Sequence, residues 1–231
     1  MEKISATCIS SYEMCPLQFF FNYELKLLQL PNPAFIIGTA YHKALELFHT
    51  GNSEEKIKYD IKELVESIED YALVMGMFNK YKNNPIEGKT ISNEFNFTQK
   101  VPMVDIPLFG YIDRIDEDKI VEYKTSSFDY KDENIKTLQS LIYTYVVYKQ
   151  KGKILPVYYS VNNKKKVHNT KYVPQKLIVQ YNENDMVNIE KKIQEFYQKV
   201  INEKDFKPKQ GNHCYWCAYG FKGTNNCNHC I

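Results

Sequence analysis

The segment that decides the fold occupies residues 110–126 and reads GYIDRIDEDKIVEYKTS. Two stretches that alternate between apolar and polar residues flank the acidic turn DEDK, which predicts a β-hairpin. If residues 117 and 118 form a two-residue loop, Asp113 lies opposite Glu122. Lys124, two residues beyond Glu122, then points to the same face of the sheet. Glu-Asp is not an ideal pair for a tight turn, so a shift of one or two residues stays open.

Two carboxylates that face each other repel, and a proton or a cation between them removes the repulsion. A divalent cation with oxygen ligands fits this requirement, and a lysine beside it can orient a water molecule and stabilise charge on a phosphate. The alternative is an exposed hairpin in which Lys124 neutralises the acidic pair through a cross-strand salt bridge. The spacing alone does not separate these two interpretations.

The composition is that of a globular protein. The chain has 231 residues, of which 43% are hydrophobic and 25% are charged, so it can bury a sizeable core and is not disordered. A net charge of +2 excludes a basic coat over the whole surface, so a nucleic acid would have to meet a local patch. The first residues, MEKISATC, do not resemble a signal peptide, and no stretch has the roughly twenty apolar residues of a membrane span. We therefore expect a cytoplasmic protein that has no membrane partner.

The hydrophobic periodicity predicts helices first, then a small sheet that is interrupted by a helix, which indicates an α/β or α+β fold with a helical flank. Ser5 and Ser53 are expected to cap the first and the fourth helix. The expected helices are residues 5–14, 17–28, 35–50, 53–81, 133–149 and 183–203, and the expected strands are 91–100, 106–116, 119–126, 155–161 and 171–181.

An Asp followed by Glu-x-Lys on adjoining strands resembles the PD-(D/E)XK nuclease superfamily. Gly38-Thr39-Ala40-Tyr41-His42 is similar to the histidine-bearing helix of its RecB/AddB-like branch, and Gln139 and Tyr143 match the Q-x-x-x-Y motif of that branch. The resemblance implies an α/β restriction-endonuclease-like core, a small mixed central sheet flanked by helices. It also implies a helical N-terminal segment and a metal-bound, Cys-rich C-terminal tail.

The resemblance assigns a role to each matching residue. Asp113, Glu122 and His42 would hold Mg²⁺ or Mn²⁺, with the carbonyl of Tyr123 as a further ligand, and Lys124 would position the attacking water. Gln139 and Tyr143 would hold the DNA strand. Two further features each allow two interpretations. Glu94 is either a further acidic contributor or a solvated carboxylate, and residues 164–166 (KKK) either contact phosphates or form a solvated loop tip.

The cysteines are unevenly distributed. Six are present, and four of them, Cys214, Cys217, Cys227 and Cys230, lie in a polar tail, which indicates metal binding in a reducing compartment. Cys15-Pro16 is similar to the start of the iron–sulfur members of the same branch, among them AddB, the CRISPR-adaptation exonucleases and their phage relatives. That likeness implies a [4Fe–4S] cluster on Cys15, Cys214, Cys217 and Cys227, with Cys230 as the alternative fourth ligand. The tail spacing C-x₂-C-x₉-C-x₂-C also suits a four-thiolate Zn²⁺ knuckle.

We therefore expect one nuclease domain over residues 1–231, in which residues 1–30 and 205–231 together form the metal-cluster module. The expected activity is metal-dependent hydrolysis of DNA by an exonuclease that acts on single strands or DNA ends. The alternative is a catalytically inert DNA-binding or assembly subunit with a zinc knuckle, although retention of all three core residues favours an enzyme. Recombination, repair and CRISPR-adaptation proteins are the candidate protein partners, and cleavage polarity and oligomeric state stay open.

Overall fold

The computed structural model describes residues 1–27, 33–220 and 227. The chain divides into two compact units. The central unit comprises the described parts of Asn32–Asn96 and Tyr111–Met186. The terminal unit comprises those of Met1–Pro31, Phe97–Gly110 and Val187–Ile231.

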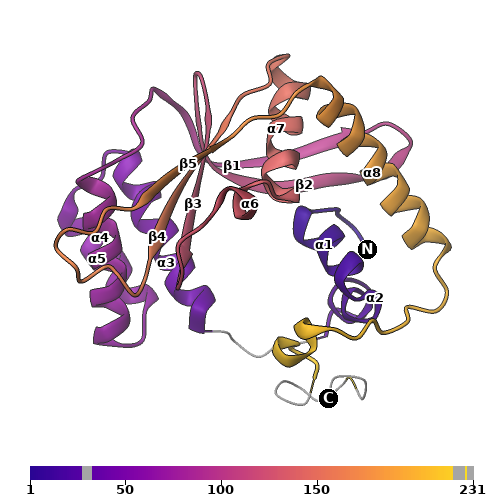
Figure 1. Ribbon diagram of the computed structural model, residues 1–231, viewed down its shortest axis with the longest axis horizontal. Helices are drawn as coiled ribbons and strands as arrows, with labels where there is room; N and C mark the ends of the chain where they lie inside the picture. Colours follow the sequence, from indigo (N-terminus) through magenta and orange to yellow (C-terminus); the bar gives the residue numbers. More distant parts are fainter. Residues whose placement is uncertain (28–32, 221–226, 228–231) are drawn as a thin grey trace. The chain divides into compact units, whose positions relative to one another are not determined.

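The helices follow the predicted order along the chain (Figure 1). Ser5 caps the first helix as predicted, because its side chain accepts a hydrogen bond from the backbone N–H of Cys8 at 3.1 Å. The helices are α1 (Ala6–Met14), α2 (Pro16–Phe19), α3 (Pro33–His49), α4 (Glu54–Leu64), α5 (Ile68–Lys82), α6 (Asp132–Ile135), α7 (Leu138–Lys151) and α8 (Glu183–Asn202), with a π-helical turn at Phe20–Glu24 and a 3₁₀ turn at Asn212–Trp216.

Five strands form one mixed sheet in the order β1-β2-β3-β4-β5. They are β1 (Thr90–Val101), β2 (Val104–Asp116), β3 (Ile120–Ser126), β4 (Val157–Asn163) and β5 (Gln175–Val179). The pairs β2–β3 and β4–β5 are antiparallel, whereas β3 and β4 are parallel and are joined through α6 and α7. The predicted α/β class with a small mixed sheet and flanking helices is confirmed, and it is consistent with a restriction-endonuclease-like core.

The β2–β3 hairpin has the predicted register. Arg114 pairs with Val121 and Ile115 with Ile120, and the backbone N–H of Asp116 donates to the carbonyl of Lys119 at 2.9 Å. The recorded ladder ends at Arg114, one pair before Asp113 and Glu122. Asp113 lies just beyond the paired residues, and its carboxylate accepts a hydrogen bond from the backbone N–H of Tyr123 on β3 at 2.7 Å.

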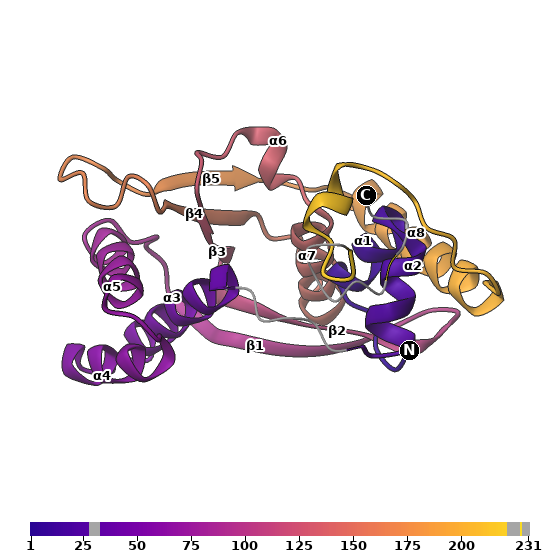
Figure 2. The same ribbon diagram turned by 90° about the horizontal axis from the view of Figure 1, so that it is seen from below.

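The main core of the central unit lies between the sheet and helices α3, α4 and α5 (Figures 1 and 2). From β3, Val121 and Tyr123 enter this core and pack with helix residues such as Tyr41 and Phe78. Because side chains alternate along a strand, Glu122 and Lys124 face away from that apolar layer. We call the face against these helices the apolar side of the hairpin, and the face with the acidic pair and the lysine its polar side, although that face also buries Ile120 and Tyr159.

Two predicted helices are each broken in the structure. The helix expected over residues 53–81 is α4 followed by α5, and the one expected over 133–149 is α6 followed by α7. In both cases a hydroxyl residue caps the second helix, since Ser67 accepts from the backbone N–H of Asp70 and Thr137 from that of Ser140. These local caps satisfy the first turn of the new helix and stop the preceding one from continuing.

A buried arginine organises the apolar side of the hairpin. Arg114 has no exposed surface, and its guanidinium donates to both carboxylate oxygens of Asp116, at 2.8 and 2.6 Å. It also donates to the carbonyl of Ile86 at 2.8 Å and reaches His49 at 3.0 Å. Burial, and then the positive charge of Arg114, lower the pKa of His49 to about 4, so the imidazole is neutral at pH 7.

The terminal unit is built around aromatic rings. Phe19 packs edge-on against Tyr12 and Phe196, and Phe206 stacks on both Phe19 and Phe20. Ile4 forms a parallel bridge with Leu108, which ties the N-terminal segment to this part of β2. Among the described residues, no helix combines the length and the apolar character that a membrane crossing would need.

Replacing the buried arginine should destabilise the protein strongly. Arg114→Met removes both guanidinium hydrogen bonds from Asp116, which is fully buried, and leaves it only the more distant Lys119 at 3.8 Å, so the free energy of unfolding should fall by about 3 kcal/mol. The matched control is Lys89→Met, which removes an exposed ion pair with Glu117 of the hairpin turn and should change the free energy of unfolding far less. Urea denaturation measures both values. Equal losses in the two variants would contradict the proposed importance of the buried pair.

Candidate active site

His42 from α3 meets Asp113 from β2 just beyond the paired residues of the hairpin. The Nδ1 atom of His42 lies 3.1 Å from Oδ1 of Asp113, and Oδ2 of Asp113 accepts a hydrogen bond from the backbone N–H of Tyr123 at 2.7 Å. Asp113 is therefore held by a helix on one side and by the backbone of β3 on the other. Two residues that lie 71 positions apart in the sequence are brought into contact.

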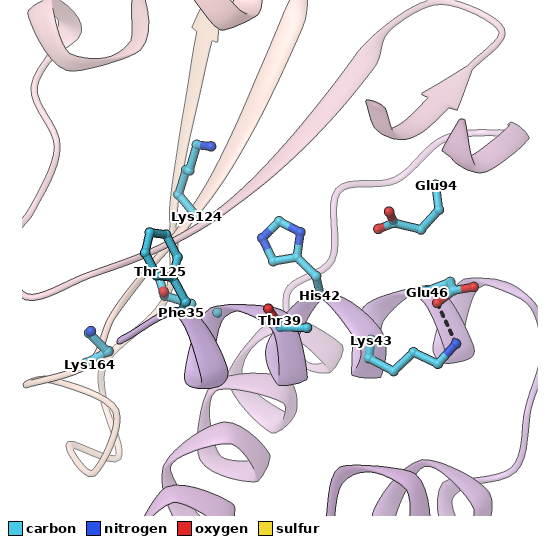
Figure 3. A pocket seen from close by; sticks show the side chains of 10 residues that line it. Phe35, Thr39, His42, Lys43, Glu46, Glu94, Lys124, Thr125 and Lys164 are labelled. Carbon is cyan, nitrogen blue, oxygen red and sulfur yellow. Dashed lines mark hydrogen bonds and ion pairs between the residues drawn. The ribbon is translucent and has the colours of Figure 1, made fainter. Parts of the chain in front are cut away.

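Glu94 from β1 joins this pair. One ligand atom from each of His42, Glu94 and Asp113 can be chosen so that all three lie within 4.8 Å of one another. Figure 3 shows the Glu94 carboxylate and the His42 ring pointing toward each other. The backbone of Glu94 has a φ of 46°, which residues with a side chain rarely adopt. Such a conformation inside a strand redirects the side chain, and conformations of this kind concentrate at functional sites.

The electrostatics of the cluster are those of carboxylates forced together. Burial and then the charge of Asp113 raise the pKa of Glu122 to about 7, and the same two causes raise the pKa of Glu94 to about 7. Burial alone would raise the pKa of Asp113 and lower that of His42. Their mutual attraction outweighs it, so that the pKa of Asp113 falls and that of His42 rises to about 9. In the absence of a cation, protons supply the missing positive charge.

The donor set fits a divalent cation. Glu122 is buried, and its Oε2 atom has no hydrogen-bond partner although it is shielded from solvent. A buried carboxylate oxygen without a partner is costly unless a ligand uses it. Together with the carboxylates of Glu94 and Asp113 and the imidazole of His42, it offers the oxygen and nitrogen ligands that Mg²⁺ and Mn²⁺ accept.

Lys124 lies next to this cluster on β3. Its Nζ atom is 2.5 Å from Oε1 of Glu122 and donates to Oε1 of Gln139 on α7 at 2.9 Å. The side-chain amide of Gln139 donates in turn to the hydroxyl of Tyr143 at 2.6 Å. The structure thus brings Gln139 and Tyr143 to the predicted lysine. Tyr143 itself is only 6% exposed.

His42, Glu94 and Lys124 line a pocket of about 770 Å³ in the central unit (Figure 3). One wall is helix α3, and the other walls come from β1, β3 and the turn after β4. The pocket is lined by Phe35, Gly38, Thr39, His42, Lys43, Glu46, Glu94, Lys124, Thr125 and Lys164. A space of this size beside a possible metal site can accept a substrate group.

The lysines of the run at residues 164–166 have different surroundings in the structure. Lys164 lines the pocket, whereas Lys166 forms an ion pair with Asp129. Of the two interpretations, contact with a phosphate is thus better suited to Lys164 than to Lys166. The geometry likewise favours Glu94 as a further acidic contributor.

The predicted cluster cysteines gather in the terminal unit. Cys15, Cys214, Cys217 and Cys227 line one small cavity together with apolar residues such as Leu17 and Phe21. Cys15, Cys217 and Cys227 are buried, and the backbone N–H of Lys209 lies 3.5 Å from the sulfur of Cys15. The alternative ligand Cys230 lies outside the described residues.

The hydrogen bonds of Arg114, on the face of the hairpin opposite Asp113, were not predicted from the sequence. The hydroxyl of Tyr123 lies 3.3 Å from Arg114 and 3.3 Å from the hydroxyl of Tyr81, so the residue whose backbone holds Asp113 is itself anchored. A signal was present, because Arg114 and Asp116 are two residues apart on a strand and must share a face. That face is the one opposite Asp113.

Comparison with known proteins agrees with this geometry. The model of a family described as the PD-(D/E)XK nuclease superfamily matches residues 3–221. No curated protein matches the sequence.

Two solved structures are similar to this chain. One is a protein from Eubacterium rectale whose name assigns it provisionally as an exonuclease, with 15% identity, a TM-score of 0.61, and coverage of 94% of this chain and 88% of that chain. This likeness supports the fold. The crystal structure of SSO0001 has 10% identity and a TM-score of 0.43, and it covers 100% of this chain and 87% of that one.

The repulsion within the cluster should be measurable in the metal-free protein. The folded state binds the Glu94 proton more tightly than the unfolded state, so this group lowers the free energy of unfolding as the pH rises from about 4.5 to about 7. In EDTA, Glu94→Gln should therefore raise the melting temperature relative to the wild type at about pH 8 and change it much less at about pH 5.

Glu66→Gln is the control for this measurement, because Glu66 is exposed in the link between α4 and α5 and does not line the pocket. Its effect on the melting temperature should be similar at both pH values. If the Glu94→Gln effect were equally independent of pH, the carboxylate repulsion would be refuted.

Proposed function

Because the chain belongs to the PD-(D/E)XK nuclease superfamily, we propose that it is a metal-dependent nuclease that hydrolyses phosphodiester bonds in DNA. The observation that carries this proposal is the meeting of His42, Glu94 and Asp113 beside Glu122, whose Oε2 atom is buried without a partner. Lys124 borders the same acidic cluster. The sequence resemblance further supports an exonuclease that acts on single strands or DNA ends.

In the proposed mechanism, His42, Glu94, Asp113 and Glu122 hold Mg²⁺ or Mn²⁺, with the Tyr123 carbonyl as a further ligand. A bound divalent ion lowers the pKa of a water molecule and stabilises the charge that develops on the phosphate. The backbone N–H of Tyr123 orients Asp113, and Oδ1 of Asp113 lies 3.1 Å from Nδ1 of His42, so both side chains would reach one ion with His42 in its neutral form. Arg114 acts behind them, because it anchors the side chain of Tyr123.

Lys124 is proposed to orient the attacking water. A lysine ammonium has three hydrogen-bond donors, and two of them meet Glu122 and Gln139. One donor is left for the water or for a phosphate oxygen. Burial alone would lower the pKa of Lys124, but the charge of Glu122 raises it, so the side chain stays positively charged.

Gln139 and Tyr143 are proposed to support this lysine and to contact the DNA strand. Gln139 accepts from Lys124 and donates to Tyr143, so both of its side-chain polar atoms have assigned partners. Because Tyr143 is almost fully buried, the strand would meet Gln139 first. Tyr143 would act by fixing the amide of Gln139, which sets the position of the ammonium group of Lys124.

Cleavage assays test the proposed nuclease. Asp113→Ala, Glu122→Ala and Lys124→Ala should each lower the cleavage of end-labelled single-stranded and duplex DNA in Mg²⁺ or Mn²⁺ by about 10²–10³-fold or more. EDTA should abolish cleavage by the wild type. Asp118→Ala is the control, because it removes an exposed carboxylate from the turn of the same hairpin. Wild-type rates in the Asp113→Ala protein would refute the assignment.

We further propose that Cys15, Cys214, Cys217 and Cys227 hold a structural [4Fe–4S] cluster, and that residues 1–30 and 205–231 form its module within the nuclease domain. Their shared cavity supports this proposal. Cys15 lines the same cavity as the three described cysteines of the tail, and a zinc knuckle built from the tail alone would not require it there.

An iron–sulfur cluster and a zinc ion would give different phenotypes in cysteine variants. If the protein holds an iron–sulfur cluster, anaerobically purified Cys15→Ser should lack both the brown absorbance at about 400 nm and the bound iron. Its melting temperature should also be lower than that of the wild type. With a zinc knuckle, Cys15→Ser should keep its metal and Cys230→Ser should lose it. Cys8→Ser is the matched control, because Cys8 is buried but does not line the cavity. Full iron retention by Cys15→Ser would exclude the cluster.

A further inference from the structure

An exposed aromatic ring lies in the wall of the active-site pocket. Phe35, near the start of α3, is 71% exposed and lines the pocket together with His42 and Lys124. Its ring has no ring partner among the described residues, although the chain packs many other aromatic side chains against each other. Leaving a phenylalanine in water forgoes the favourable free energy that burial of its ring would give. An exposed ring inside a pocket therefore suggests a ligand.

Helix α3 presents Phe35 and the metal-site histidine on one face. Positions 35, 38, 39, 42, 43 and 46 all line the pocket, and their spacing of three and four residues is that of one helix face. Phe35 is seven residues before His42, so it lies about 10 Å away along the helix axis. One or two nucleotides of an extended strand can span that distance.

Gly38 lies between these two residues on the same face. A Cβ atom at this position would meet only Oγ1 of Thr125, at 4.0 Å, which is an ordinary contact. Packing inside the protein therefore does not require glycine here, and glycine inside a helix is less stable than alanine. Its effect is to keep the pocket wall open between Phe35 and His42, where a sugar or a phosphate would pass.

Lys164 supplies positive charge beside the ring. It starts the turn after β4, and its backbone N–H is fixed to the carbonyl of Ser126 at 2.7 Å. Lys43 in the same pocket pairs with Glu46, whereas Lys164 has no ion-pair partner in the described part of the chain. In Figure 3, Phe35, Lys124 and Lys164 are seen on one side of the pocket, away from Glu94 and Glu46.

We propose that Phe35 stacks on an unpaired base of the substrate strand while Lys164 binds a phosphate of the same strand. This inference rests on the nuclease function proposed above, and it specifies the substrate as single-stranded DNA or an unpaired strand end. Paired bases inside a duplex are already stacked on both faces and offer no free surface to Phe35. Aromatic stacking accepts every base, so the pocket would select strand state rather than sequence.

Binding in EDTA tests the stacking without cleavage. The full-length protein is titrated with a fluorescein-labelled oligothymidylate and with an abasic oligonucleotide of the same length and charge. Stacking should make the oligothymidylate bind about tenfold more tightly. Phe35→Ala should abolish this preference and Phe35→Trp should keep it. Phe128→Ala, the control, should also keep it, because Phe128 is 61% exposed but does not line the pocket.

Lys164→Ala should weaken the binding of both oligonucleotides by the same factor and reduce the salt dependence of binding by about one phosphate contact. Lys171→Ala removes an exposed lysine from the same connection between β4 and β5, and it should change neither the affinity nor its salt dependence.

The stacking proposal is overturned if the wild type does not distinguish the two oligonucleotides, or if Phe35→Ala still does. A preference for oligothymidylate that persists in a protein unable to cleave DNA in Mg²⁺ or Mn²⁺ would overturn the nuclease function and leave the stacking intact.

Discussion

Repulsion between carboxylates in a confined, partly buried space is the constraint on which the rest of the site depends. Glu94, Asp113 and Glu122 come from three different strands, and burial raises the energy of every ionised form. The surrounding residues reduce this repulsion in two ways. His42 and Lys124 bring positive charge to the cluster, while the backbone N–H of Tyr123 fixes Asp113. What remains unsatisfied, above all the Oε2 atom of Glu122, defines the chemistry that the site can perform.

The two sides of the β2–β3 hairpin have different roles: one stabilises the fold, and the other carries the candidate active-site residues. On the apolar side, Arg114 and Asp116 form a buried ion pair that is completed by a carbonyl and a neutral histidine. On the polar side, Glu122 and Lys124 face the pocket and α7. Tyr123 joins the two sides, because its ring belongs to the core and its backbone holds Asp113. A change in the core can therefore reach the site through one residue.

Much of this arrangement could be predicted from the sequence, because the hairpin is a local structure. Alternation and the acidic turn predicted its register, and that register places Asp113 and Glu122 opposite each other. The break between α4 and α5 was missed although Ser67 and Asp70 carry a helix-start signal, since the apolar periodicity continues across it. The position of Glu94 and the partners of Arg114 depend on contacts between distant segments and on one left-handed backbone residue. A single sequence does not encode such contacts in its local pattern.

The parallel pairing of β3 with β4 has a consequence for how the protein is made. Glu122 and Lys124 pair with Tyr159 and Val161, which follow them by a connection that includes two helices. A growing chain emerges from the ribosome with its N-terminus first, so β3 exists for some time without this neighbour. The hairpin and its contact with α3 can form first, because their residues precede β4, whereas the sheet neighbour of Glu122 and Lys124 is complete only after residue 163 has been synthesised. Chains that end before β4 would therefore carry the acidic pair on a sheet that lacks half of its centre.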